Sequence, residues 1–142
     1  MALFLDTSAL IKLFDPEPGS REVAEMVQSD GRLFLACVAP HEMLSAVKRK
    51  VREGRLPGER AGRMLEDFRS VFLPGAQVVA FDAEVSGQAL ALLARHGDAG
   101  LRVLDAIQLA CCLAVPSATM VLADQQLARI ARAEAMTVRL VG

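Results

Sequence analysis

Short apolar runs alternate along the chain with longer segments in which apolar residues recur every three or four positions. The short runs are typical of β-strands buried on both faces, and the longer segments are typical of amphipathic helices. The runs that predict strands are residues 2–5, 33–38, 77–81, 119–123 and 137–141. The segments that predict helices are residues 7–14, 20 to about 30, 40–53, 57 to about 72, 83–95, 101–115 and 125–135.

Proline, glycine and small polar residues mark where these elements begin and end. Residues 15–19 contain two prolines and a glycine, which end the first helix. We expect Ser20 to cap the second helix and Asp82 to cap the helix over 83–95, because their side chains can accept from free backbone N–H groups. Pro40 suits the first turn of the helix that it opens.

The alternation of strands and helices predicts an α/β fold, a three-layer α/β/α sandwich around a parallel sheet of four to five strands. Hydrophobic residues make up 53% of the 142 positions, and Trp and Tyr are absent. Such an aliphatic composition suits a parallel sheet that helices cover on both faces. The chain has no repeat, linker or low-complexity segment, so we predict one domain over residues 1–142.

The sequence indicates neither a membrane span nor a disulfide or zinc framework. Its longest unbroken apolar runs, residues 33–39 and 109–115, are seven residues each, whereas a membrane helix needs about 20. No basic stretch precedes the first apolar run, so we expect no secretory signal. Cys37, Cys111 and Cys112 have no zinc-ligand spacing. We therefore expect free thiols in a cytoplasmic protein.

Four acidic residues map to the carboxyl edge of the predicted sheet, where open parallel sheets bind their ligands. Asp6 ends the first strand, and Asp124 immediately follows the fourth. Glu42 lies in the first turn of the helix after the second strand. Asp105 lies about one turn into the helix that leads to the fourth strand. We predict that these four carboxylates meet at one site.

Each of these acids, taken singly, also has a structural explanation. Asp6 and Asp124 can cap helices, and Glu42 gains from the dipole of its helix. Asp105 can pair with Arg102, three residues earlier, although its other neighbours are apolar. These alternatives stay open for the individual residues.

The four acids together point to a metal site. Four like charges at one edge repel each other unless a cation neutralises them. Ligands that offer only oxygen select hard ions, so we predict Mg²⁺ or Mn²⁺ rather than zinc. His41 and His96 are not spaced as metal ligands.

A basic stretch follows Glu42 in the sequence. Residues 48–63 contain seven Lys and Arg against two Glu, a local charge of +5 in a chain whose net charge is −1. Such a stretch is either the solvated face of a helix or a surface for a nucleic-acid backbone. The sequence alone leaves both interpretations open.

Four short motifs carry a resemblance to a known family. The motifs are LDTSAL at 5–10, HEMLSA at 41–46, LDAIQLA at 104–110 and VLADQQL at 121–127. Their order and spacing, from Leu3 to about Leu140, are similar to those of the PIN-domain family, particularly the VapC-like toxins of prokaryotic toxin–antitoxin pairs. The chain departs from the pattern at Leu122, where the family often has Thr, and at Gln125 and Gln126, where some members have a further acid.

The resemblance implies a single PIN-like domain that acts as a metal-dependent endoribonuclease. In this interpretation Mg²⁺ or Mn²⁺ activates the water that attacks an RNA phosphodiester. Asp6 and Asp105 would mainly hold the metal, and Asp124 and Glu42 would complete its shell directly or through water. Ser8 would be a hydrogen-bond partner behind the ligands.

The resemblance also implies partners. They are an RNA substrate, a cognate antitoxin whose tail covers the acidic pocket, and a second copy of the chain in a homodimer. We expect the helices between Ser20 and Phe72 to make the protein contacts. The basic stretch over 48–63 would lie along the RNA.

Three other classes of protein share features with this sequence but fit it less well. A haloacid-dehalogenase-like phosphatase also begins with a strand that ends in Asp, but it needs a second Asp at the position of Ser8. A receiver domain needs an acidic pair at the first strand, where this chain has Asp6 alone, and Asp82 has no plausible partner Lys. A catalytically silent PIN-like binding module would have no reason to maintain a self-repelling acidic cluster.

Overall fold

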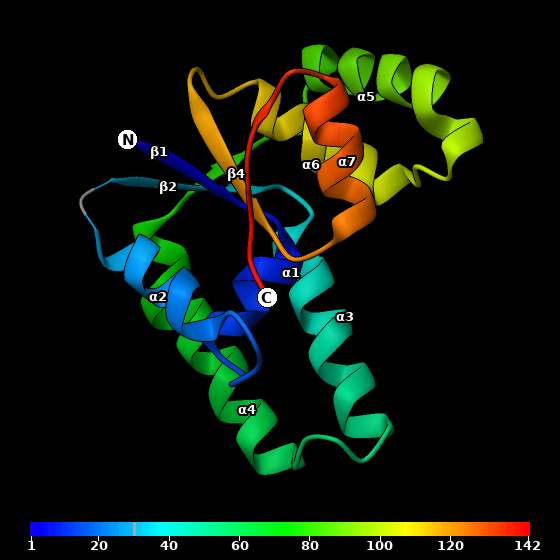
Figure 1. Cartoon of the computed structure of the whole chain (residues 1–142). Coiled ribbons are helices and arrows are strands. Elements are labelled where there is room, and N and C mark those ends of the chain that lie inside the picture. The colour runs from blue at the N-terminus through cyan, green and yellow to red at the C-terminus, as the bar shows by residue number, and fades with distance from the viewer. Residues whose placement is uncertain (30) are drawn as a thin grey trace.

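The computed structural model describes residues 1–29 and 31–142, and its centre is a five-stranded parallel sheet (Figure 1). The strand order β3-β2-β1-β4-β5 places the N-terminal strand in the middle. The predicted α/β class with an all-parallel sheet is confirmed. The strands are β1 (Ala2–Leu5), β2 (Arg32–Ala36), β3 (Gln77–Val79), β4 (Ala118–Leu122) and β5 (Thr137–Leu140).

The position of each strand explains its composition. β1 lies between β2 and β4, with Leu3 opposite Leu33 on one side and Thr119 on the other. Every residue of β1 is buried, whereas the edge strands β3 and β5 contain exposed residues. A central parallel strand is covered on both faces, so the residues on both of its sides must be apolar.

Helices cover both faces of the sheet and complete the three layers that the sequence predicts. Helices α5, α6 and α7 contribute to the core on one face, and α1 to α4 contribute to the core on the other (Figure 1). The helices are α1 (Thr7–Leu10), α2 (Ser20–Gln28), α3 (Ala39–Arg52), α4 (Gly58–Asp67), α5 (Ala83–His96), α6 (Val103–Leu113) and α7 (Gln125–Ala133).

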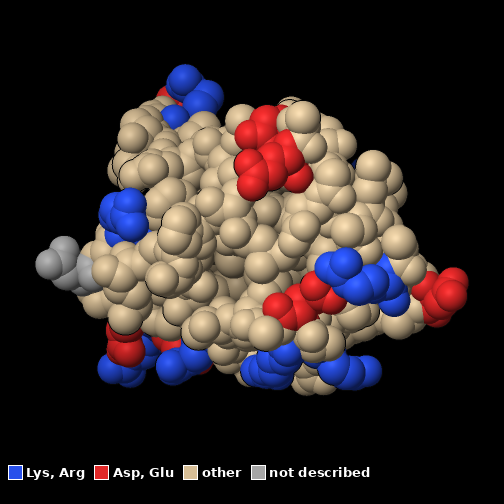
Figure 2. All heavy atoms as spheres, turned by 90° about the horizontal axis from the view of Figure 1, so that it is seen from above, with Lys and Arg blue, Asp and Glu red and all other residues tan. Residues whose placement is uncertain are grey.

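The face seen from above has few charged side chains in its middle. Lys, Arg, Asp and Glu stand in separate groups, mostly towards the edge of this view (Figure 2). The coloured residues of this face therefore form no continuous basic surface (Figure 2).

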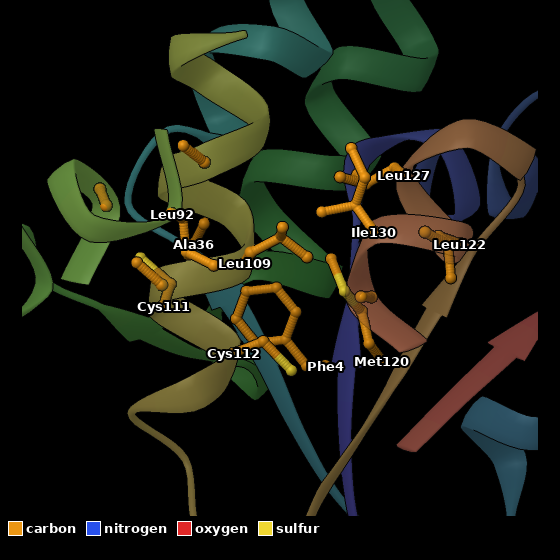
Figure 3. Close-up of a cluster of buried hydrophobic side chains, with 14 of the residues drawn as sticks. Phe4, Ala36, Leu92, Leu109, Cys111, Cys112, Met120, Leu122, Leu127 and Ile130 are labelled. Carbon is orange, nitrogen blue, oxygen red and sulfur yellow. The ribbon is translucent and has the colours of Figure 1, made fainter. Parts of the chain in front are cut away.

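Alternate residues of β1 serve the two cores, as the two-residue period of a strand requires. Phe4 is fully buried in the first core with Leu109 of α6 and Met120 of β4 (Figure 3). Leu3 and Leu5 belong to the second core. The strand that carries Asp6 at its end is therefore fixed from both sides.

Free thiols occupy the first core, as the sequence predicts. Cys111 and Cys112 are buried, and Cys37 beside them is partly buried; all three are free. Burial raises the pKa of both Cys111 and Cys112 to about 12. Their thiols are therefore uncharged packing groups near neutral pH.

The ends of several elements differ from the prediction. The first helix changes to a 3₁₀ turn at Ile11–Leu13, and the helix of α4 continues as a π-turn at Phe68–Phe72. Ser20 is not a helix cap but the first residue of α2. Its hydroxyl instead accepts from the backbone N–H of Glu17 at 2.9 Å, and Gly19 is the cap residue.

The cap position before α2 requires a left-handed backbone conformation, which glycine adopts readily. The φ of Gly19 is +92°, a conformation that favours glycine. A Cβ atom there would also lie 2.7 Å from the backbone nitrogen of Gly142. The turn before α2 thus requires glycine for two reasons, and a serine cap would have fitted at that position only with strain.

Helix α2 ends at Gln28, and residue 30, near which the sequence places that end, lies outside the described residues. No helix in the described ranges is long and apolar enough to cross a membrane.

Candidate active site

The four acids predicted from the sequence all line one groove at the carboxyl edge of the sheet. Asp6 follows β1, and Asp124 lies just after β4; each accepts a backbone hydrogen bond at the start of the next helix. Glu42 and Asp105 lie in the first turns of α3 and α6. The groove has a volume of about 960 Å³. Elements from both helical layers therefore bring these carboxylates together.

Asp6 is the most buried of the four, at 6% exposure. Its Oδ2 accepts from the backbone N–H of Ser8 at 3.2 Å and from the Ser8 hydroxyl at 2.5 Å. The pKa of Asp6 is raised to about 6. Burial is the main cause; the two hydrogen bonds from Ser8 oppose it, and the charges of Glu42 and Asp105 add to it. The Oδ1 atom accepts no hydrogen bond from a described residue, so it remains available to a ligand.

Ser8 joins the two central strands behind the site. Its hydroxyl donates to Asp6 and accepts from the backbone N–H of Ala123 at 2.9 Å. Ala123 lies directly before Asp124. A single hydroxyl therefore fixes the orientation of Asp6 relative to the segment that carries Asp124.

Two side chains hold Glu42 by one oxygen. Its Oε1 accepts from the Thr7 hydroxyl at 3.0 Å and from Nε2 of Gln108 at 2.7 Å. The same Nε2 donates to the Thr7 oxygen at 3.0 Å. No hydrogen bond from the described residues reaches Oε2 of Glu42, which leaves that oxygen for a ligand.

The carboxylate of Asp105 has no hydrogen-bond or ion-pair partner among the described residues. The structure places no ion pair or side-chain hydrogen bond on its carboxylate there, so the alternative explanation, a pair with Arg102, does not form. Partial burial raises the pKa of Asp105, the charge of Asp124 raises it further, and the charge of Arg102 lowers it. Both carboxylate oxygens of Asp105 are therefore available to a ligand.

Asp124 caps helix α7 with one carboxylate oxygen, and its other oxygen accepts no hydrogen bond from a described residue. Its Oδ1 accepts from the backbone N–H of Leu127 at 3.0 Å, at the start of α7. The capping explanation from the sequence is therefore correct for Asp124, and likewise for Asp6 at α1. Capping uses one oxygen of each carboxylate and leaves the other, so it does not compete with a role in the groove.

The donor set of the groove fits a hydrated divalent cation. Across the described residues, no three His, Cys, Asp or Glu side chains are grouped closely enough to hold a metal ion between them. The four carboxylates nevertheless line one groove and retain at least one free oxygen each. Oxygen donors of this kind suit Mg²⁺ or Mn²⁺, which keep several of their waters. His41 also lines the groove, but its neighbours supply no nitrogen set for zinc.

Thr7 and Gln108 were missed by the sequence analysis. Gln108 is fully buried on α6, and its Oε1 has no partner among the described groups. It is the one polar residue between Asp105 and Pro116. A buried amide in such an apolar helix must find a hydrogen-bond partner, and this signal could have identified it from the sequence.

Comparison with known proteins extends these observations. The family model described as PIN domain matches residues 3–133. Ribonuclease VapC3 of Pyrobaculum aerophilum is 31% identical over 128 residues, which cover 90% of this chain and 93% of that protein.

Solved structures share the fold at low sequence identity. VapBC2 from Rickettsia felis, bound to a DNA fragment from its promoter, matches with a TM-score of 0.71 and 16% identity over the full length of both chains. FitAcB from Neisseria gonorrhoeae matches with a TM-score of 0.71 and 18% identity, over 97% of this chain and 96% of that one. The family match over residues 3–133 and the 31% identity to Ribonuclease VapC3 show that the chain belongs to the PIN-domain family.

Proposed function

We propose that this protein is a metal-dependent endoribonuclease and the toxin of a toxin–antitoxin pair. The observation that carries the proposal is the set of four carboxylates in one groove, each with at least one oxygen that no described residue engages. The similarity of the chain to Ribonuclease VapC3 supports RNA as the substrate.

Asp6 and Asp105 would mainly hold the ion, and Glu42 and Asp124 would complete its shell directly or through water. Mg²⁺ or Mn²⁺, when bound, lowers the pKa of a coordinated water and offsets the negative charge that develops on the phosphate. No three carboxylates among the described side chains lie close enough together to hold one ion directly, so in this proposal water would complete the shell.

The contribution of the chain is to set the direction of each carboxylate before a ligand arrives. Ser8 fixes one oxygen of Asp6, and Thr7 with Gln108 fixes one oxygen of Glu42. Each free oxygen then faces a position determined by protein hydrogen bonds. Such preorganisation is what a metal-dependent active site requires from the residues behind its ligands.

The proposal includes protein partners. Solved structures with this fold include VapBC assemblies, and one of them, VapBC-5 from Mycobacterium tuberculosis, is a member of the VapBC family of toxin–antitoxin systems. We extend this to a cognate antitoxin and a homodimer that contact the helices between Ser20 and Phe72, in the cytoplasm. Copurification from the native operon and light scattering test this. A chain that is monomeric at micromolar concentration and that copurifies with no partner would count against it.

The activity itself is tested by adding and removing metal. Purified protein is incubated with a structured RNA, and its cleavage products are separated by electrophoresis. Mg²⁺ or Mn²⁺ should support cleavage, EDTA should stop it, and excess metal should restore it. Persistent cleavage in EDTA, or no cleavage with either ion, would contradict the proposal and would favour a silent binding module.

A further inference from the structure

We propose that Arg49 and Arg102 bind the RNA phosphates on either side of the phosphate that is cut. This inference rests on the proposed function and assigns the substrate contacts of the same groove. It follows from an asymmetry among the basic residues of the groove: some are already neutralised by the protein, and two are not.

Four cationic side chains line the groove, and two of them are neutralised by the protein. Lys12 is buried, and its Nζ lies 3.2 Å from Oε1 of Glu17 and 2.6 Å from the carbonyl oxygen of Pro18. Lys50 is also buried, with its Nζ 2.5 Å from Oδ2 of Asp15. Lys12 thus holds the loop after α1 together, and Lys50 fastens that loop to α3. The charges of both lysines are therefore neutralised within the fold.

Arg49 and Arg102 are the other two cations of the groove. Both are exposed, and the ion pairs and hydrogen bonds among the described residues involve neither guanidinium. A guanidinium presents a planar set of donors that matches two phosphate oxygens. These two side chains are therefore available to a phosphate without breaking any contact of the fold.

Each arginine shares a helix region with one of the four acids. Arg49 follows Glu42 by seven residues on α3, which corresponds to about 10 Å along the helix at about 1.5 Å per residue. Arg102 is the residue before α6 and precedes Asp105 by three positions. The groove thus carries one cation and one acid on α3, and one cation and one acid at the start of α6.

The groove continues beyond Arg102. A second hollow of about 100 Å³ shares Arg102, Asp105 and Asp124 with the first and reaches Gly100 and Gln126. A strand that enters along α3 can therefore pass the acids and leave past Arg102.

Ion pairs within the protein neutralise several of the charges in the basic stretch over residues 48–63. Lys50 and Arg60 pair with Asp15, Arg55 pairs with Glu53, and Arg63 pairs with Glu59. The stretch is therefore not a free surface of charge +5. Lys48 and Arg52 are exposed and unpaired among the described residues, but they do not line the groove.

Lys48 and Arg52 are consequently matched controls for Arg49. All three lie on α3, and a change of any of them to Gln removes one positive charge. If only the net charge mattered to RNA, the three substitutions would weaken binding equally. If Arg49 holds a phosphate, its substitution alone should have a large effect.

The test measures binding of a fluorescein-labelled 12-nucleotide single-stranded RNA by anisotropy over a series of salt concentrations. The Asp6→Asn background prevents cleavage, and Arg49→Gln, Arg102→Gln, Lys48→Gln and Arg52→Gln are compared within it. We expect Arg49→Gln and Arg102→Gln each to weaken binding about tenfold. Each should also lower the salt slope by about one. The two controls should change affinity less than about threefold.

Equal losses in the Arg49 and Lys48 variants would overturn the proposal. So would an unchanged salt slope in Arg102→Gln together with altered Mn²⁺ binding by the Arg102→Gln chain with native Asp6, since Arg102 would then act on Asp105 rather than on RNA. Cleavage by the chain with native Asp6, measured in parallel, separates this result from the proposed function. An active nuclease whose two arginines are dispensable keeps the function and loses the inference.

Discussion

Nε2 of Gln108 lies 2.7 Å from Oε1 of Glu42, a hydrogen bond between helices α6 and α3 from opposite layers of the sandwich. The bond comes from a fully buried amide whose own oxygen has no partner among the described groups. An unpaired buried carbonyl costs about 1–3 kcal/mol. This arrangement gives Glu42 a fixed orientation at the expense of stability, which indicates a role for Gln108 in the site rather than in the core.

The first prediction concerns that bond. Gln108→Met keeps the length of the side chain but cannot donate to Glu42 or Thr7. The cleavage rate should fall about tenfold or more, and Mn²⁺ should bind more weakly, as when the hydrogen-bond partner of a ligand is removed. The melting temperature should change little, because the unpaired carbonyl disappears with the bonds. Gln88→Met, on an exposed position of α5, is the control.

The affinity of Gln108→Met for Mn²⁺ is the measurement that tests this prediction. Calorimetric titration with Mn²⁺ reports on the site without any need for catalysis. Gln108→Met protein that binds Mn²⁺ like the native chain but melts much lower would show a purely structural amide.

The second prediction concerns pH and the contact between α5 and α7. Glu134 accepts from Arg95 at 2.7 Å and lies 2.6 Å from Nε2 of His96. The hydrogen bond from Arg95, followed by that from His96, lowers the pKa of Glu134 to about 2. A carboxyl whose pKa is lowered by folding stabilises the protein above its ordinary pKa of 4.5. That contribution is lost as the pH falls from about 4.5 towards 2.

Urea unfolding of the native chain and of Glu134→Gln tests the sign. At pH 7 the variant should be less stable by about 1 kcal/mol, a modest value because the pair is partly exposed. The difference should shrink as the pH falls below 4.5. Glu84→Gln, at an exposed position without an ion pair among the described residues, should show no such trend. A difference between Glu134→Gln and the native chain that is constant from pH 7 to pH 2.5 would rule this explanation out.

The third prediction ties stability to the acidic groove. The carboxylate of Asp105 raises the repulsion at the site when no metal is bound. Metal-free Asp105→Asn protein should therefore melt no lower than the metal-free native chain. Mn²⁺ at a hundredfold excess over its Kd should stabilise the native chain by about 2.7 kcal/mol, which is a melting shift of several degrees. Asp105→Asn should lose most of this shift.

Four melting curves, for each protein with and without Mn²⁺, make this comparison. The competing explanation is that Asp105 stabilises its helix through Arg102. It requires a lower melting temperature for metal-free Asp105→Asn and no effect of Mn²⁺ on either protein.

The fold and the acids of the site could be predicted from the sequence because local patterns determine them. Apolar runs identify the strands, and the carboxyl edge of a parallel sheet then collects Asp6 and Asp124 without any knowledge of tertiary contacts. Ser8, two residues after Asp6, lies within reach of it in any structure with this turn. Such relationships span only a few residues, and local chemistry suffices for them.

The hydrogen bonds behind Glu42 could not be predicted in this way. Gln108 is 66 residues from Glu42 and 101 from Thr7 along the chain, so their contact depends on how the two layers pack. The same limit applies to the basic stretch, where Lys50 and Arg60 pair with Asp15 across 35 and 45 residues. The sequence shows charges, but only the fold shows which of them remain free.

The central claim is that the acidic groove cuts RNA with a bound metal, and the most direct measurement is the cleavage rate of three single variants with Mn²⁺. Asp6→Asn and Asp105→Asn should each reduce the rate at least about 100-fold, because each removes a metal ligand. Asp67→Asn, an exposed acid on α4 outside the groove, should stay within about twofold of the native rate. Undiminished cleavage by Asp6→Asn or Asp105→Asn would contradict the account.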